Sequence, residues 1–124
     1  MAGSGRSLLE ALEHWAAAQP DKVLHTFLDD RGDPVSSITY RGLLDQSAAL
    51  AATLLAPSGS SSSSSGGGAA LSPSSSGGSG VGGCGLKPGD RALLVFPPSL
   101  DFIVAFYACL RAGVIAVPVF PPGE

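Results

Sequence analysis

The sequence predicts an α/β fold that is interrupted by a long loop. Two stretches, residues 7–56 and 84–122, carry almost all of the large apolar side chains, in patterns typical of helices and strands. Between them, residues 57–83 consist mostly of serine and glycine. The second stretch contains two short, continuously apolar runs, which are typical of buried parallel strands. We therefore expect both stretches to contribute to one core.

The first expected element is a helix over residues 8–18. Ser7 and Glu10 have the spacing of a capping box, in which each side chain bonds the other residue's backbone N–H. Pro20 ends the helical pattern. The apolar residues that recur every three or four positions are Leu8, Leu9, Leu12, Trp15 and Ala16.

A hairpin and a second helix should follow. Residues 23–28 and 35–39 are rich in strand-forming side chains, and the intervening Asp-Asp-Arg-Gly-Asp-Pro favours a turn. Thr39 can cap the second helix. Its buried side is expected to comprise Leu43, Leu44, Ala48, Leu50, Ala51, Leu54 and Leu55. Residues 1–56 are thus expected to form a helix–hairpin–helix unit.

Residues 57–83 are predicted to be a disordered, low-complexity insertion. They include an unbroken run of serines at 60–65. Such a segment buries too little apolar surface to offset the entropy that is lost on ordering it. Because the cost of closing a loop grows only slowly with its length, the fold can tolerate this insertion.

Residues 84–124 are predicted to form a β–α–β unit with parallel strands. The turn-rich segment 85–90 leads into an apolar strand at 91–96, and a second apolar strand lies at 114–119. Between them, Ser99 can cap a helix that carries Asp101 in its first turn and ends at Gly113. The apolar residues at helical spacing are Leu100, Ile103, Val104, Tyr107 and Leu110. The crossover should be right-handed.

Charge and cysteine content exclude several classes of protein. The net charge is -3 and the seven Lys and Arg are scattered, so we expect no nucleic-acid partner. Cys84 and Cys109 are too few for a disulfide framework and are not spaced as a metal site. Charged residues interrupt the amino terminus, so no signal peptide is expected. These features favour an intracellular, cytoplasmic protein.

Residues 102–120 approach the length of a membrane-spanning helix. Arg111 lies near the middle of this segment, where it would cost about 2.5–3.5 kcal/mol in a membrane, and Pro118 would disturb a helix. A buried helix followed by a buried strand is favoured, so we expect no membrane span. A small membrane-associated protein is the weaker alternative.

Several short motifs have ordinary explanations. Residues 80–85 match G-x-G-x-x-G, but no strand precedes them and no helix follows, as a dinucleotide site requires. Residues 31–33 spell Arg-Gly-Asp, a known cell-adhesion tripeptide, but the same residues are ordinary choices for a hairpin turn, which is favoured. His14 and His25 lack neighbours that would indicate a triad or a metal site, and Cys109 is expected in a buried helix. We therefore assign no catalytic, cofactor-binding or metal-binding residue.

The order of motifs nevertheless resembles one family. The segments 7–10, 19–22, 38–40 and above all 85–91 (Gly-Leu-Lys-Pro-Gly-Asp-Arg) resemble the start of adenylate-forming (AMP-binding) enzymes. Residues 96–102, 105–113 and 116–122, with their double prolines, look more like the fatty-acyl-AMP ligase branch. The resemblance implies that residues 1–124 are the incomplete N-terminal part of the large domain of such an enzyme.

This resemblance also implies a chemistry for the parent polypeptide. The family activates a carboxylic acid with ATP and Mg²⁺ to give an acyl-adenylate and pyrophosphate, here from a fatty acid, with CoA or an acyl carrier protein as acceptor. The family's phosphate loop, adenine motif, ribose-binding Asp and C-terminal Lys do not match any residue of this sequence. Residues 1–124 alone are therefore expected to bind no cofactor, to be inactive, and to be marginally stable or prone to aggregate. The alternative is a non-catalytic, acyl-ligase-like module for interaction or regulation.

Overall fold

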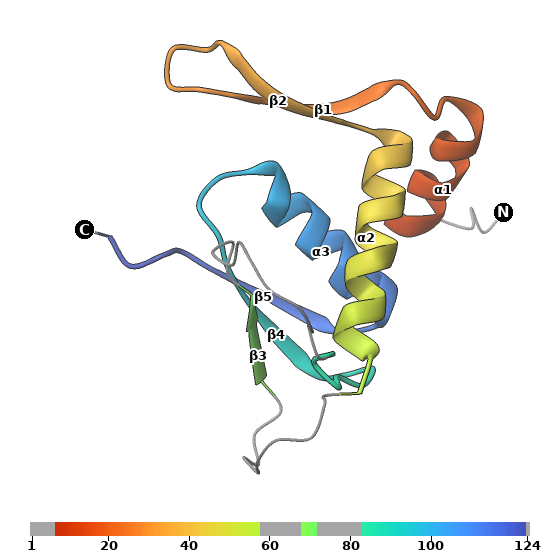
Figure 1. Ribbon diagram of the computed structural model, residues 1–124, viewed down its shortest axis with the longest axis vertical. Helices are drawn as coiled ribbons and strands as arrows, with labels where there is room; N and C mark the ends of the chain where they lie inside the picture. Colours follow the sequence, from red (N-terminus) through yellow and green to blue (C-terminus); the bar gives the residue numbers. More distant parts are fainter. Residues whose placement is uncertain (1–6, 58–67, 72–82, 124) are drawn as a thin grey trace, which may run out of the picture.

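The α/β class is confirmed by a computed structural model, which describes residues 7–57, 68–71 and 83–123 (Figure 1). The elements in chain order are α1 (Leu8–Ala18), β1 (Val23–Leu28), β2 (Pro34–Thr39), α2 (Tyr40–Leu55), β3 (Gly68–Leu71), β4 (Arg91–Val95), α3 (Leu100–Ala112) and β5 (Ile115–Val119). β1 and β2 form an antiparallel ribbon, and the second sheet is parallel, with the strand order β3-β4-β5. As predicted, a helix connects the neighbouring parallel strands β4 and β5.

Local hydrogen bonds explain where the first two helices begin. The Ser7 N–H donates to Glu10 Oε2 at 2.7 Å and the Glu10 N–H donates to Ser7 Oγ at 3.2 Å, which confirms the capping box of α1. The Gly42 N–H donates to Thr39 Oγ1 at 3.0 Å, so Thr39 caps α2 as predicted. Each cap satisfies backbone groups that the helix itself cannot.

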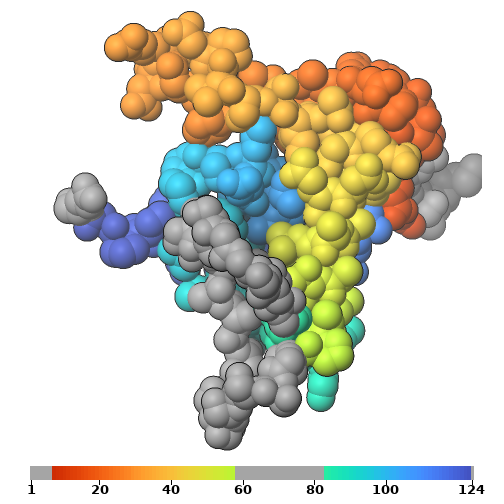
Figure 2. All heavy atoms as spheres, viewed as in Figure 1, coloured from red at the N-terminus to blue at the C-terminus, as the bar shows by residue number. Residues whose placement is uncertain are grey.

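The Arg-Gly-Asp tripeptide lies in the turn between β1 and β2, as the sequence predicts. One carboxylate oxygen of Asp29 accepts from the N–H groups of Arg31 and Asp33, both at 2.9 Å. Gly32 has φ of 88°, which a residue without a side chain adopts readily. The ribbon extends away from the helices at one end of the molecule (Figure 2).

The parallel sheet contains a strand that the sequence did not predict. β3 lies inside the predicted loop 57–83 and pairs with β4 from Gly68↔Arg91 to Leu71↔Leu94. Its residues, Gly-Ala-Ala-Leu, include one large apolar side chain, whereas our prediction relied on runs of such side chains. An open strand edge offers unpaired backbone N–H and C=O groups, so a strand can pair there even when most of its side chains are small. Residues 58–67 and 72–82 of the predicted insertion, which include residues 80–82 of the G-x-G-x-x-G match, lie outside the described residues.

The described ends of the predicted insertion meet in space. The segment that follows the insertion bonds to the end of α2. The Cys84 N–H donates to the Thr53 carbonyl at 3.0 Å, and the Gly85 N–H donates to the Ala56 carbonyl at 2.7 Å. The Leu86 N–H donates to the Leu54 carbonyl at 2.9 Å. These bonds satisfy carbonyls at the end of α2 and bring the chain back beside the point at which it left.

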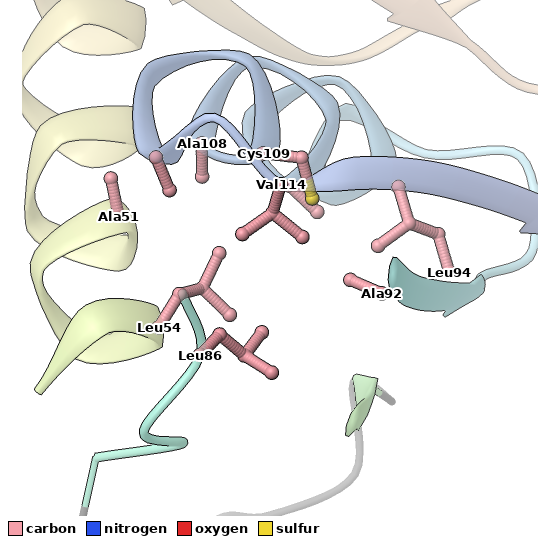
Figure 3. Close-up of a cluster of buried hydrophobic side chains, with 10 residues drawn as sticks. Ala51, Leu54, Leu86, Ala92, Leu94, Ala108, Cys109 and Val114 are labelled. Carbon is pink, nitrogen blue, oxygen red and sulfur yellow. The ribbon is translucent and has the colours of Figure 1, made fainter. Parts of the chain in front are cut away.

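The main core lies between α2, α3 and one face of the parallel sheet (Figure 3). α2 supplies Ala51 and Leu54, α3 supplies Ala108 and Cys109, and β4 supplies Ala92 and Leu94. A second cluster, Leu12, Ile38, Leu43 and Val104, joins α1, β2 and α2 to α3. α3 contributes to both clusters and is the central element of the fold.

Two positions of α2 differ from the predicted buried side. Leu55 is exposed, and Ser47 is fully buried although it was not expected in the core. The Ser47 hydroxyl donates to the Leu44 carbonyl at 3.0 Å, so its burial leaves no donor unpaired. Within the described ranges, no helix is long and apolar enough to cross a membrane. The strand predicted to be buried over 114–119 is only partly so, because β5 has no buried residue and Ile115 and Val119 are exposed at its ends.

Candidate functional site at the carboxyl ends of the parallel strands

The most specific motif of the sequence, Gly-Leu-Lys-Pro-Gly-Asp, connects the end of α3 to the start of β4. The Asp90 N–H donates to the Lys87 carbonyl at 3.0 Å, and the Lys87 N–H donates to the Asp90 carboxylate at 2.8 Å. Gly89 has φ of 92° and its N–H donates to the Gly113 carbonyl at 2.9 Å. The motif therefore holds the start of β4 against the end of α3.

α3 begins at Ser99, but not in the way that the sequence predicts. Ser99 has the extended backbone of an N-cap residue, yet its side chain makes no capping hydrogen bond. Its Oγ is buried and has no hydrogen-bond partner among the described residues. The prediction that the Ser99 hydroxyl caps α3 is therefore wrong. The other two predictions for this helix are right: Asp101 lies in its first turn, and Gly113, with φ of 72°, ends it.

An apolar hollow of about 300 Å³ lies where β4 and β5 end. It is lined by residues 96–98, which follow β4, by Phe102 in the first turns of α3, and by residues 118–120, which end and follow β5. We call the space that these residues line the apolar hollow. In open α/β sheets, ligands bind at the carboxyl ends of the strands, which makes this hollow the candidate site.

The hollow has aromatic walls and no charge. Phe96 packs edge-to-face on Phe102, with ring centroids 6.4 Å apart, and Phe102 is in turn 6.2 Å from Phe106. Phe120 follows β5 and is 94% exposed. Because every lining residue is Phe, Pro or Val, the hollow can bind an apolar group but cannot transfer a proton or bind an ion through its side chains.

The thiols and imidazoles are not gathered into a site. Cys109 is buried, and burial raises the pKa of its thiol, which keeps it protonated and a poor nucleophile. Cys84 is half-buried beside the end of α2. His14 packs edge-to-face against Trp15, and His25 pairs with Ile38 in the ribbon. The described part of the chain holds no cluster of His, Cys, Asp or Glu that could bind a metal ion.

The described residues do not fit ATP or Mg²⁺. A phosphate cradle needs backbone N–H groups or a Lys aimed at the ligand, whereas the candidate hollow is apolar and the first turn of α3 already carries the negative Asp101. The side chains of the hollow therefore supply no group for a step of an adenylation reaction.

Sequence reasoning assigned no site residue and so missed Phe96, Phe102 and Phe120. A signal was present, because each apolar run is followed at once by phenylalanine or proline, at 96–98 and at 118–122. The carboxyl ends of parallel strands meet at one edge of a sheet, so two such segments are brought together. Their pairing register, from Arg91↔Ile115 to Val95↔Val119, is what only the structure supplies.

Comparisons with known proteins agree on one relationship. A family described as "AMP-binding enzyme" matches residues 78–122. The human protein "Disco-interacting protein 2 homolog A" is 37% identical over 118 residues, which are 94% of this chain and 6% of that protein. "Long-chain-fatty-acid--AMP ligase FadD32" of Mycolicibacterium smegmatis is 29% identical over 123 residues, which are 97% of this chain and 15% of that protein.

A solved structure is similar over nearly the whole chain. The fatty acid AMP ligase from Legionella pneumophila superposes with a TM-score of 0.70 and 34% identity, over 98% of this chain and 16% of that one. The chain thus spans about a sixth or less of the length of each of these relatives.

Proposed function

We propose that the polypeptide carrying this chain activates a fatty acid with ATP. The match of residues 78–122 to the AMP-binding enzyme family and the similarity to fatty-acid AMP ligases support this proposal. The reaction joins the carboxylate to AMP and releases pyrophosphate. In this proposal, residues 1–124 contribute three parallel strands and their covering helices to the large domain, and they are inactive alone.

One observation carries the proposal more than any other. The match to the fatty acid AMP ligase from Legionella pneumophila combines 34% identity with a TM-score of 0.70 over 98% of the chain. It therefore includes the hairpin and both helices of residues 8–55 as well as the β–α–β unit. A likeness that rested on the widespread β–α–β arrangement alone would not extend to the hairpin.

Several finer parts of the proposal rest on the family resemblance. We propose ATP and Mg²⁺ as the cofactors of the whole polypeptide, with groups for them supplied outside the described residues. We further propose that CoA or an acyl carrier protein accepts the acyl group, and that the protein is intracellular and cytoplasmic.

The test is ATP–pyrophosphate exchange. A polypeptide that contains residues 1–124 together with the family's phosphate loop and C-terminal Lys is incubated with ATP, Mg²⁺, labelled pyrophosphate and dodecanoate. We expect label to enter ATP only when dodecanoate is present, and residues 1–124 alone to give no exchange. Exchange that is absent with every fatty acid from eight to eighteen carbons would contradict the proposal.

A second candidate is a non-catalytic, acyl-ligase-like interaction module. It is favoured by the relative at 37% identity, whose name describes an interaction with another protein and no ligase activity. The same exchange assay separates the two functions. A polypeptide that folds, contains the phosphate loop and gives no fatty-acid-dependent exchange would favour the module.

A further inference from the structure

β4 has a sequence that favours pairing with a second copy of itself. It contains no proline, its one charged residue is Arg91, and the residues that follow are Ala, Leu, Leu and Val. Short segments with apolar side chains and little charge pair readily between molecules when their backbone edge is open. The way in which the two edges of β4 are covered therefore bears on whether the chain stays monomeric.

The edge of β4 on one side is covered by β5, whose own outer edge is a poor template for a further strand. Among the described strands, β5 pairs with β4 alone. Pro118 lies within β5 and has no N–H to donate to an added strand. This side of the sheet is thus protected by its own sequence.

The other edge of β4 is covered by β3. β3 pairs in parallel with residues 91–94, and its residues, Gly-Ala-Ala-Leu, include one large apolar side chain. We propose that β3 is a guard strand, which occupies the edge of β4 that would otherwise pair with a second copy of this chain. The proposal does not depend on the proposed function.

The connections of β3 explain how so short a strand holds this edge. Residues 56–67 join it to α2, and residues 72–83 join it to the segment that bonds back to the end of α2. A short tether gives β3 an effective concentration of about millimolar beside β4. A second copy of the chain, at about micromolar concentration, competes poorly with it.

Two uncovered β4 strands should pair in the antiparallel direction, because a twofold axis relates two identical strands in this way. Leu93, the central residue of β4, then lies opposite its counterpart in the second copy. Leu93 is 42% exposed, whereas its neighbours Ala92 and Leu94 are buried in the core. A lysine at position 93 would therefore place like charges opposite each other and disfavour the pair.

The test removes the pairing of β3 with two prolines, Ala69→Pro and Ala70→Pro. The N–H groups of successive strand residues point to opposite sides, so one of the two prolines removes an N–H that faces β4. We expect the dimer dissociation constant of residues 1–124, measured by sedimentation equilibrium, to fall at least tenfold. A guard that covers the edge about nine-tenths of the time weakens pairing of two copies about a hundredfold.

The matched control is Ser62→Pro with Ser63→Pro, which adds the same two prolines to the tether and leaves the sequence of β3 unchanged. Its dissociation constant should stay within twofold of that of the wild type. The proposal is overturned if the wild type and the β3 variant have equal constants, or if the control falls as far as the β3 variant.

A second pair of variants distinguishes edge pairing from unfolding. Leu93→Lys, added to the β3 variant, should raise the dissociation constant at least tenfold and restore the monomer. Leu110→Lys, at a side chain of α3 that is 37% exposed, is the matched control and should leave the β3 variant associated. Association that persists with Leu93→Lys, or that both lysines abolish equally, would place the contact elsewhere and contradict the proposal.

Discussion

The two sheets of this chain are stabilised in different ways. In the β1–β2 ribbon, only Ile38 is buried, and the turn is fixed by the bonds that Asp29 accepts within five residues. In the parallel sheet, Ala92 and Leu94 of β4 are fully buried beneath α2 and α3, and β4 pairs with β5 across an intervening helix. The ribbon takes its shape from local sequence, whereas the parallel sheet depends on packing between distant segments.

This difference bears on where function can lie. The parallel sheet ends at an apolar hollow that is built from three separate segments, and α3 holds those segments in place. A hollow of similar volume lies on the ribbon, but its lining mixes serine and threonine with valine and proline and belongs to two adjacent strands. A substitution that loosens α3 or β4 should therefore affect the hollow, and one in the ribbon should not.

The largest expected effect is that of a truncation in the sheet core. Leu94→Ala removes a side chain that is 0% exposed and should lower the free energy of unfolding by about 2–5 kcal/mol. Val35→Ala, at a position 62% exposed in the ribbon, should change it by less than about 0.5 kcal/mol. Urea unfolding followed by circular dichroism measures both, and equal effects would contradict the comparison.

Two glycines with positive φ, Gly32 in the ribbon turn and Gly113 at the end of α3, allow the two regions to be compared by the same substitution. Gly113→Ala strains the left-handed end of α3, and its new Cβ would lie 3.3 Å from Pro88 Cβ. We expect a loss of about 1–2 kcal/mol. Gly32→Ala carries the backbone strain alone, since nothing lies within 4 Å of its new Cβ. The loss at Gly32 should be smaller in the same unfolding measurement, and a larger loss at Gly32 would count against the packing at Pro88.

The smallest expected effects come from two helix caps. Thr39→Ala removes the hydroxyl that accepts from the Gly42 N–H and should cost about 1 kcal/mol. Ser99→Ala removes a buried hydroxyl that has no partner among the described residues, so stability should be unchanged or slightly higher. A loss at Ser99 as large as that at Thr39, by thermal unfolding of both variants, would show that Ser99 does cap α3.

The sequence predicted those elements whose signals are local. α1 has the predicted bounds, because Ser7 and Glu10 fix its start and Pro20 limits its end. The hairpin turn is also local, since Asp29, Gly32 and Asp33 lie within five residues. Each of these elements is set by bonds between near neighbours in the chain.

The features that the sequence did not predict depend on distant segments or on side-chain orientation. β3 has only one large apolar side chain and is defined by its pairing with β4, about twenty residues further along the chain. Ser99 has the right residue type for a cap, but the type does not fix the direction of the hydroxyl. The hollow required the register of β4 and β5, so Phe96 and Phe120 could not be placed together from the sequence alone.

Amide hydrogen exchange tests the central claim most directly, because it measures the stability of each strand separately. The account predicts that the amides of β4 exchange slowest in the chain and at rates close to those of global unfolding. The amides of β1 and β2 should exchange at least tenfold faster, through local opening of the ribbon. Ribbon amides that are protected as strongly as those of β4 would contradict it.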